Sequence, residues 1–375
     1  ERMERLLGGV AAAGVDGLLV SVPENSYYLS GFQAVTYSRP VLLWAAARPF
    51  LLVPELEEHH ARERSRIGEI VVYSDEGMGG KSPLRLALEC AAVKLLSHGV
   101  RGAIGFEPHG FDLPGAAALN AALGSEPVPL AGLVERLRLV KDEEEIAYLR
   151  EMAAVADAGI RAAMEATRTG VTEIELDAIS YGRMAREALK RRPEWRFRYG
   201  SRPVSGEKSA LPHSIHDGKA LAAGEIVIHE TGGAAEGYWV EVERTCVVGS
   251  ASAEQERLFG AMLRSFEAGR DTALPGVRCE EVDRASRRVF EEEGLIEYVR
   301  HRTGHGLGLH YHEPPYFSLG DETVLEPGMV MSVEPGIYVP GVGGFRHSDT
   351  FVVTDSGLET LSDVPYDLPS LTLKA

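Results

Sequence analysis

Residues 304–313 read GHGLGLHYHE and residues 332–336 read SVEPG, so that histidines and carboxylates stand among glycines. Carboxylates on strands beside glycine turns are commonly used to hold divalent metals or to act as general acids, because the strand is rigid and the backbone open. Glu334 lies between Val333 and Pro335, and its charge needs a partner if this strand is buried. These two stretches predict a reactive site, and the segments around them decide the fold.

Further segments of the second half repeat this mixture of histidine and carboxylate. They read LPHSIH (211–216), IVIHETG (226–232), GYWVEVERT (237–245) and RHSDT (346–350). Eight of the twelve histidines lie between His213 and His347. Glu230 is flanked by a β-branched run typical of a central strand, and strand alternation turns His229 away from the face of Glu230. We therefore expect the chemistry in this part of the chain.

The chain from residue 141 onward has a helical period and an internal repeat. Apolar residues at spacings of three and four predict a long helix over 146–164, and the capping-box pattern at Thr172 opens a second helix. Gly276-Val277 repeats Gly170-Val171 at an offset of 106 residues (276 − 170), again within a pair of expected helices. Each pair is followed by glycine-rich, strand-like sequence. Two such halves would place a cleft between them, which is a natural location for a site.

The first 130 residues alternate short apolar runs with helix-like stretches. The runs at 17–21, 41–45, 50–53 and 69–73 read as buried strands, and the stretches at 1–14, 55–66 and 83–97 read as helices. This alternation predicts an α/β layer architecture with a buried sheet. Prolines and a glycine at 126–133 mark a domain boundary. The glycine-bearing stretch 75–80 reads as a surface loop, because it lacks the Gly-Lys-Ser/Thr context of a phosphate loop.

The composition is that of a globular protein and limits the function. The 375 residues hold 39 Lys and Arg against 56 Asp and Glu, a net charge of −17, which argues against nucleic acid because phosphates are bound through clustered basic residues. Three cysteines without metal-type spacing indicate a reducing compartment, so we expect a cytoplasmic protein. No apolar run approaches the roughly 20 residues that span a bilayer. The first residues, ERMER, do not resemble a signal peptide, and no membrane partner is expected.

At this point the sequence resembles the pita-bread superfamily of prolidases, aminopeptidases P, methionine aminopeptidases and creatinase. Residues 16–32 look like the amino-terminal domain of creatinase and prolidase, and residues 137–146 look like the junction into the catalytic domain. Residues 304–308 and 334–336 resemble the catalytic segments. The resemblance covers nearly the whole chain, and its layout is closest to small bacterial Xaa-Pro peptidases.

The resemblance implies an α/β fold of two domains. Residues 1–130 would form a creatinase-type amino-terminal α/β domain, and residues 131–375 a pita-bread hydrolase domain with pseudo-twofold symmetry. The site would lie between the two halves of the second domain. Resemblance to creatinase and prolidases also implies a homodimer.

Peptidases of this superfamily hold two divalent metals with two Asp, one His and two Glu. The matching positions here are Glu230, Glu241, His305, Glu334 and Ser348. Replacing Asp by Glu displaces the carboxylate by more than the ~0.2 Å tolerance of metal–ligand distances, and Ser348 removes a bridging charge. A standard dinuclear site is therefore not expected. The cofactor is either absent or a single divalent metal (Mn, Zn, Fe or Co) held by Glu230, Glu241, His305 and Glu334.

The resemblance also implies roles in catalysis and substrate binding. Creatinase lacks the metal ligands and uses a histidine that matches His213 as acid and base, while Glu243 matches a carboxylate that holds its cationic substrate. The peptidases use residues matching His213 and His312 to bind substrate and to stabilise the tetrahedral intermediate. The predicted catalytic residues are His213, His312, Glu334 and Glu243. The predicted substrate-binding residues are His213, His312, Arg346 and His347.

Three functions stay open at this stage. The first is a hydrolase with an altered metal site that cleaves a C–N bond of a small peptide-like (Xaa-Pro-like) or amidine-like substrate. The second is a metal-independent amidinohydrolase or amide hydrolase of creatinase type. The third is a catalytically inactive binding homologue. On either hydrolase reading the partner is a small molecule or a dipeptide.

Overall fold

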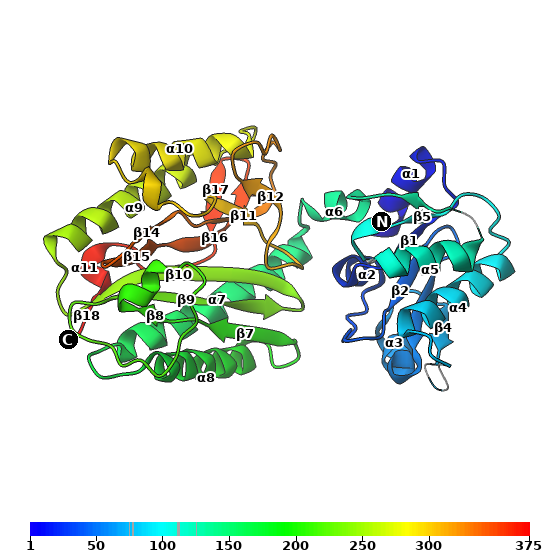
Figure 1. Ribbon diagram of the computed structural model, residues 1–375, viewed down its shortest axis with the longest axis horizontal. Helices are drawn as coiled ribbons and strands as arrows, with labels where there is room; N and C mark the ends of the chain where they lie inside the picture. The colour runs from blue at the N-terminus through cyan, green and yellow to red at the C-terminus, as the bar shows by residue number, and fades with distance from the viewer. Residues whose placement is uncertain (75, 77–78, 111–112, 125) are drawn as a thin grey trace. The chain divides into compact units, whose positions relative to one another are not determined.

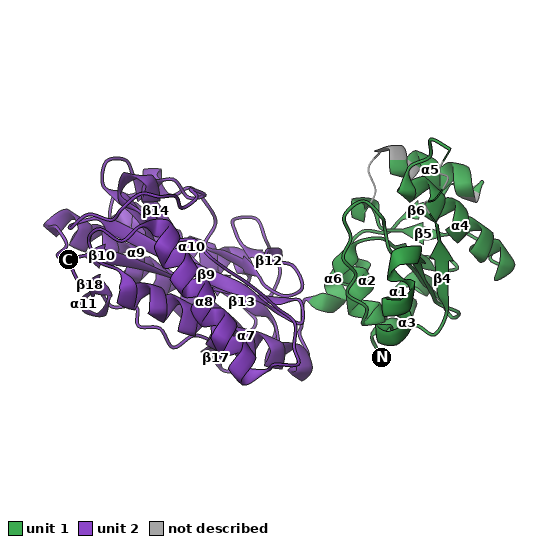
Figure 2. Ribbon diagram, turned by 90° about the horizontal axis from the view of Figure 1, so that it is seen from below, with its two compact units in different colours: residues 1–138 green, residues 139–375 purple. Residues whose placement is uncertain are grey.

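The computed structural model describes residues 1–74, 76, 79–110, 113–124 and 126–375. Asp75, Gly77 and Met78, which belong to the 75–80 stretch read above as a loop, lie outside the described residues. The chain divides into two compact units, Glu1–Arg138 and Leu139–Ala375 (Figure 2). Among the described helices, none is both long enough and apolar enough to cross a membrane.

The first unit is built on a six-stranded sheet with strand order β4-β3-β2-β1-β5-β6. The strands are β1 (Leu18–Val20), β2 (Leu42–Ala45), β3 (Phe50–Pro54), β4 (Ile70–Tyr73), β5 (Gly105–Phe106) and β6 (Val128–Pro129). The helices are α1 (Arg2–Ala12), α2 (Pro23–Ser30), η1 (Glu55–Glu57), α3 (Glu58–Arg64), α4 (Pro83–Ser97), η2 (Pro108–Gly110), α5 (Leu113–Leu123) and α6 (Leu133–Arg138). The first three strands are wholly buried, and the predicted α/β layers are confirmed.

The first unit ends later than the boundary expected at 130/131. Helix α6 belongs to it because α6 packs on α1 and α2. Tyr28 Oη donates to Leu137 O at 3.0 Å, and Arg138 Nη1 donates to Asn25 Oδ1 at 2.7 Å. These long-range bonds, which a composition shift cannot reveal, place the division at 138/139.

The second unit is built on a ten-stranded sheet whose path runs β12-β11-β13-β16-β10-β9-β7, with β17 on β16, β18 on β10 and β8 on β9. Its strands are β7 (Phe197–Ser201), β8 (Val204–Ser205), β9 (Ile226–Ala235), β10 (Tyr238–Val248), β11 (Gly304–Gly306), β12 (Glu313–Phe317), β13 (Val330–Val333), β16 (Ser348–Thr354), β17 (Gly357–Thr360) and β18 (Thr372–Leu373). A separate hairpin joins β14 (Gly336–Val339) and β15 (Gly343–Arg346). The helices are α7 (Glu143–Ala166), α8 (Glu173–Arg191), η3 (Gly206–Ala210), α9 (Ala253–Thr272), α10 (Cys279–Glu292), η4 (Ile296–Tyr298) and α11 (Leu368–Leu371).

Two helix pairs, α7 with α8 and α9 with α10, cover this sheet (Figure 1). Helix α7 packs on β9 and β10, and α9 packs on β13, β15 and β17. The predicted capping box at Thr172 is confirmed, since its side chain accepts from Glu175 N. The expected repeat also has a structural counterpart: an isolated bridge joins Thr172 to Ala220 in one half and Arg278 to Val324 in the other. Strands β9 and β10 of the first half and strands β11, β13 and β16 of the second half therefore lie in one sheet.

Candidate active site

Strand pairing sets three of the predicted site residues in one row across the sheet. Glu243 on β10 pairs in register with Glu230 on β9 and with Ser348 on β16. Because side chains two residues apart on a strand share a face, Glu241 lies on the same face as Glu243. His305 reaches this face from β11, and Glu334 follows the end of β13. The structure thus brings together all five positions that the sequence matched to metal ligands.

The glycines around His305 are required by close contacts between strands. A Cβ at Gly304 would lie 2.1 Å from Ser332 O, and one at Gly306 would lie 2.6 Å from Pro314 O. The neighbouring strands therefore approach the backbone on both sides of His305, whose side chain is fully buried. Its Nδ1 donates to Gly306 O at 3.0 Å, which fixes the ring and turns Nε2 toward the carboxylates.

One part of the cluster, which we call the guanidinium half, consists of Glu230, Glu243, Arg202 and Arg346. Arg346 Nη2 donates to Glu230 Oε2 at 2.8 Å and to Glu243 Oε1 at 2.7 Å, and its Nε also bonds Glu243. Arg202, which follows β7, donates through Nε to Glu230 Oε2 at 3.0 Å and bonds it through Nη2 as well. Both carboxylates are therefore held by charged donors that belong to the chain itself.

The electrostatics of the guanidinium half favour an ionised Glu230. Burial alone would raise the pKa of Glu230, but Arg346 and Arg202 outweigh it and hold that pKa below its usual value. Burial raises the pKa of Glu243, and the guanidinium of Arg346 opposes that rise. The charges of Glu243 and Glu230 in turn raise the pKa of Arg346, so this arginine stays protonated at every physiological pH.

The other part, the histidine half, consists of Glu241, His305, Glu334 and His312. His305 Nε2 lies 3.3 Å from Glu334 Oε1 and 3.6 Å from Glu241 Oε1. Burial lowers the pKa of His305, but the two carboxylates outweigh burial and raise it to about 9. Burial likewise opposes the ionisation of Glu334, whereas His305 lowers the pKa of Glu334 to about 2. Ser348 Oγ donates to Glu241 Oε1 at 2.7 Å, so the serine at the lost ligand position holds a neighbouring carboxylate instead.

His312 stacks on His305, with ring centroids 3.7 Å apart and an interplanar angle of 26°. Burial and the charge of His305 lower the pKa of His312 to about 4, so its ring is neutral near pH 7. Arg302 Nη2 lies 3.3 Å from His312 Nδ1 and can only donate. The proton of the neutral ring therefore resides on Nε2, which makes this nitrogen a hydrogen-bond donor.

A second histidine, His301, reaches the cluster although the sequence analysis did not single it out. Its Nε2 accepts from Tyr338 Oη at 2.7 Å, and Tyr338 Oη accepts from Arg346 Nη1 at 2.9 Å. His301 Nδ1 contacts Arg302 O at 2.8 Å, so Nδ1 carries the proton. Burial lowers the pKa of His301, in agreement with this neutral form. Its position four residues before His305 was the signal that could have identified it.

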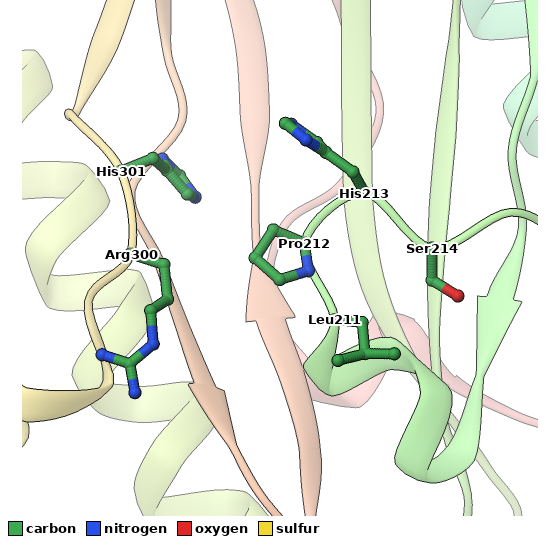
Figure 3. A pocket seen from close by; sticks show the side chains of 6 residues that line it. All are labelled: Leu211, Pro212, His213, Ser214, Arg300 and His301. Carbon is green, nitrogen blue, oxygen red and sulfur yellow. The ribbon is translucent and has the colours of Figure 1, made fainter.

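His213 lies in the loop after η3 and lines a cavity of about 430 Å³ (Figure 3). The other lining residues are Leu211, Pro212, Ser214, Arg300 and His301. Arg346 Nη1 donates to Pro212 O at 3.3 Å, which ties this loop to the guanidinium half. The cavity thus adjoins the charged cluster.

His347 and His229 lie away from the cluster. His347 is fully buried against the rings of Phe259 and Phe266 on α9, and burial lowers its pKa well below the usual value. It precedes Ser348 on the chain and faces the opposite side of the sheet, so the prediction that His347 binds substrate is wrong. His229 is turned away from Glu230, as strand alternation predicts, and is buried with Nε2 3.0 Å from Thr167 Oγ1.

These observations define the class of protein. Two helix pairs around one sheet, with a second α/β unit before them and a buried carboxylate–histidine cluster on the sheet, are the features of a pita-bread hydrolase.

Comparison with known proteins agrees with this class. The model of metallopeptidase family M24 matches residues 147–355, and the creatinase/prolidase N-terminal domain matches residues 2–140. The chain is 31% identical over 371 residues to the putative dipeptidase YkvY of Bacillus subtilis, covering 98% of this chain and 99% of that protein. It is also 31% identical over 372 residues to the Xaa-Pro dipeptidase of Pyrococcus horikoshii, covering 98% of each. The structure of the Xaa-Pro dipeptidase from Bacillus anthracis superposes with a TM-score of 0.87 at 30% identity, covering 100% of this chain and 99% of that one.

The chain belongs to metallopeptidase family M24 and is a hydrolase of this family. Its resemblance to the prolidase and creatinase group is confirmed in both domains. The family implies a divalent metal, and the side chains present must be tested for their fit to one.

The histidine half fits one cation. His305 Nε2 is buried and makes no hydrogen bond to any described residue, although two carboxylate oxygens lie within 3.6 Å of it. Glu241, His305 and His312 offer nitrogen and oxygen atoms within 4.8 Å of one another. Because a ligand lone pair lies in the ring plane, the stacked ring of His312 points alongside that of His305 and does not converge with it. Glu241 and His305 are therefore the two ligands that this geometry supports, and Glu334, whose Oε1 lies 3.3 Å from His305 Nε2, is the third ligand position that the sequence matched.

The guanidinium half does not fit a cation. Oε2 of Glu230 accepts bonds from both arginines, and both oxygens of Glu243 accept bonds from Arg346. A divalent cation there would lie beside two guanidinium groups and would have to displace them from the carboxylates. Ser348, at the remaining ligand position, is neutral.

Proposed function

We propose that the chain hydrolyses the amide bond of a small Xaa-Pro-like dipeptide and uses a single divalent cation held by Glu241, His305 and Glu334. The relatives named Xaa-Pro dipeptidase support the substrate class. The observation that carries the proposal is the buried Nε2 of His305, which faces two carboxylates without a hydrogen bond among the described residues. The cytoplasmic location and the homodimer remain predictions of the sequence.

The charge of the cluster supports a cation. Four carboxylates (Glu230, Glu241, Glu243 and Glu334) face two arginines and, in the absence of metal, a protonated His305. With all four carboxylates ionised, one negative charge is left in a buried site, where an unbalanced charge is costly. A divalent cation that displaces the proton of His305 brings the sum to zero with all four carboxylates ionised.

When bound, such a cation polarises the scissile carbonyl and lowers the pKa of the attacking water. Hydrolysis adds the hydroxyl of water to the acyl carbon and a proton to the leaving nitrogen. Glu334 accepts the proton from water, since its carboxylate lies beside His305 in the reactive cluster. His312 donates its Nε2 proton as a hydrogen bond to the carbonyl oxygen, and His213, on the cavity wall, supplies the proton to the leaving nitrogen.

The test is turnover of Xaa-Pro dipeptides by purified protein loaded in turn with Mn²⁺, Zn²⁺, Fe²⁺ or Co²⁺. We expect hydrolysis with at least one of these ions, its loss on treatment with a chelator, and its return when the ion is restored. Absence of turnover with all four ions, across a panel of dipeptides, would contradict the proposal.

A second candidate is a metal-independent amide hydrolase of creatinase type. It is favoured by one observation: burial raises the pKa of both Glu241 and Glu243, so a proton on either can replace the cation in the charge balance. In this case His213 acts as both acid and base. Activity that survives the chelator and is abolished by His213→Ala would select this candidate over the metal-dependent one.

A further inference from the structure

The segment that opens the second unit contacts the loop that carries His312. Lys141, which lies just before α7, donates through its backbone N to Gly328 O at 2.9 Å and through Nζ to Glu313 Oε1 at 2.9 Å. Both side chains of this ion pair are buried, with exposed fractions of 2% for Lys141 and 7% for Glu313. The attraction in such a pair offsets the lost hydration only when its geometry is good and further hydrogen bonds are made. The pair therefore fixes the carboxylate of Glu313 to the start of the second unit.

Glu313 in turn shapes the loop 307–312, which connects β11 to β12. Its Oε2 accepts from His310 N at 3.2 Å, and a Cβ at Gly308 would lie 2.3 Å from its Oε1. The backbone of the loop therefore wraps closely around the carboxylate, and a side chain at position 308 would displace it. Gly308 O also accepts from Trp239 N at 2.8 Å, which joins the loop to the start of β10.

The same loop carries two rings that stack beside His305. His312 stacks on His305 with ring centroids 3.7 Å apart, and Tyr311 stacks on His312 with centroids 5.1 Å apart. Tyr311 also meets Trp239 edge to face at 5.5 Å. Each ring contact of this kind contributes little by itself. The direction of the His312 ring therefore depends on the backbone of the loop.

We propose that Lys141 is a positioning residue that acts through Glu313 to hold the ring of His312 in place for the reaction. Nζ of Lys141 bonds the carboxylate, and the carboxylate bonds the loop backbone at His310, two residues before His312. Without the ammonium group, the buried carboxylate must turn toward water or take up a proton, and the loop around it moves. This inference rests on the proposed peptidase function, in which His312 bonds the carbonyl oxygen.

The experiment measures turnover of an Xaa-Pro dipeptide by the metal-loaded protein and by its Lys141 variants. Lys141→Met should lower kcat about tenfold and change KM by less than about twofold, because His312 acts on the carbonyl oxygen in the transition state. Lys141→Arg keeps the cation and should hold kcat within about threefold of the wild type. The double variant Lys141→Met/Glu313→Gln leaves no unpaired buried charge, so it should fold and still show the loss.

NMR of isotope-labelled histidine rings in the metal-free protein gives a readout that does not depend on activity. The His312 resonances, assigned with His312→Gln, should be shifted upfield in the wild type by the stacked ring of His305. In Lys141→Met and in the double variant they should move toward the values of an exposed histidine. Two controls should change neither the resonances nor the rates. Lys94→Met breaks a lysine–glutamate pair of the first unit, and Arg257→Gln alters an exposed arginine of α9.

The two readouts separate failure of this inference from failure of the proposed function. If the dipeptide is cleaved but neither Lys141→Met nor the double variant lowers kcat, Lys141 does not position His312 for the reaction. Unchanged His312 resonances in both variants overturn the inference whether or not the wild type is active, and so does an equal loss of kcat in Lys94→Met. If the wild type cleaves no dipeptide but the resonances move as expected, the positioning by Lys141 stands and the peptidase function fails.

Discussion

The guanidinium half and the histidine half balance the negative charge of their buried carboxylates in different ways. Each holds two carboxylates: Glu230 and Glu243 pair in register across β9 and β10, whereas Glu241 on β10 and Glu334 just after β13 meet at His305. In the guanidinium half, the positive charges of Arg202 and Arg346 are attached to the chain and do not titrate near neutral pH. In the histidine half, the positive charge comes from His305, whose proton can be exchanged for a cation. The first half is therefore a fixed structure, and the second can do chemistry.

The largest expected effect is a loss of activity on changing a carboxylate of the histidine half. Glu334→Gln should reduce kcat/KM by about 10²- to 10⁴-fold, because the variant loses both a ligand of the cation and the carboxylate that accepts the proton from water. Glu326→Gln, at an exposed position just before β13, is the control and should leave the steady-state rates unchanged. A loss of less than about tenfold for Glu334→Gln would place the proton acceptor elsewhere.

The next effect concerns stability and tests the guanidinium half. Arg346→Met leaves Glu230 and Glu243 without their shared partner and should lower the free energy of unfolding by about 3–5 kcal/mol. Arg202→Met should cost about 1 kcal/mol or less, because its side chain is 29% exposed and water can solvate the freed oxygen. Denaturant unfolding monitored by circular dichroism measures both. Equal losses for the two variants would mean that Arg346 is not the central partner.

The pH dependence of stability tests the histidine half in protein freed of metal. The folded-state pKa of His305 is raised to about 9 from an ordinary value of 6.5. A raised histidine pKa contributes stability that is fully present below pH 6.5 and is lost as the pH rises through 9. The loss should be about 3 kcal/mol.

The matched variant for this pH profile is His305→Gln, which should flatten it between pH 6.5 and 9. Arg202 and Arg346 should add no slope in this range, since arginine does not titrate there. A profile that is unchanged by His305→Gln would show that the carboxylates do not hold a proton on His305.

The smallest effect concerns whether a cation can bind beside the guanidinium half. Ser348→Glu restores the residue type that the superfamily has at this position, yet the two arginines still hold Glu230 and Glu243. We expect the variant to bind no additional cation and to lose about 1–3 kcal/mol of stability, because it adds a buried charge without a partner. A second tightly bound cation in this variant would show that the serine alone excludes it.

Much of the fold could be predicted from the sequence because its signals are local. Apolar runs mark the strands of the first unit, and capping residues such as Thr172 mark helix starts. The GHG segment is explained by contacts that admit no side chain at Gly304 or Gly306. The end of the first unit was predicted too early, because the contacts of α6 with α2 join residues more than 100 positions apart in the chain.

The site was predicted only in part, because some of its contacts also join residues that have no local signal in the sequence. Residues that match a motif, such as His305 and Glu334, could be placed in one cluster. Arg202 could not, because a lone arginine after a strand has no pattern, and its contact with Glu230 depends on the pairing of β7 and β8 with β9. His347 could have been excluded by alternation, since its neighbour Ser348 faces the cluster and adjacent strand residues face opposite sides.

The central claim, one exchangeable cation beside one fixed guanidinium cluster, is tested most directly by counting metal. Inductively coupled plasma mass spectrometry on protein loaded with Mn²⁺, Zn²⁺, Fe²⁺ or Co²⁺ and then desalted gives the number of ions per chain. The account predicts one ion in the wild type, none in a Glu241→Gln/His305→Gln double variant, and one in Arg257→Gln. Two ions per chain, or none with any of the four metals, would contradict it.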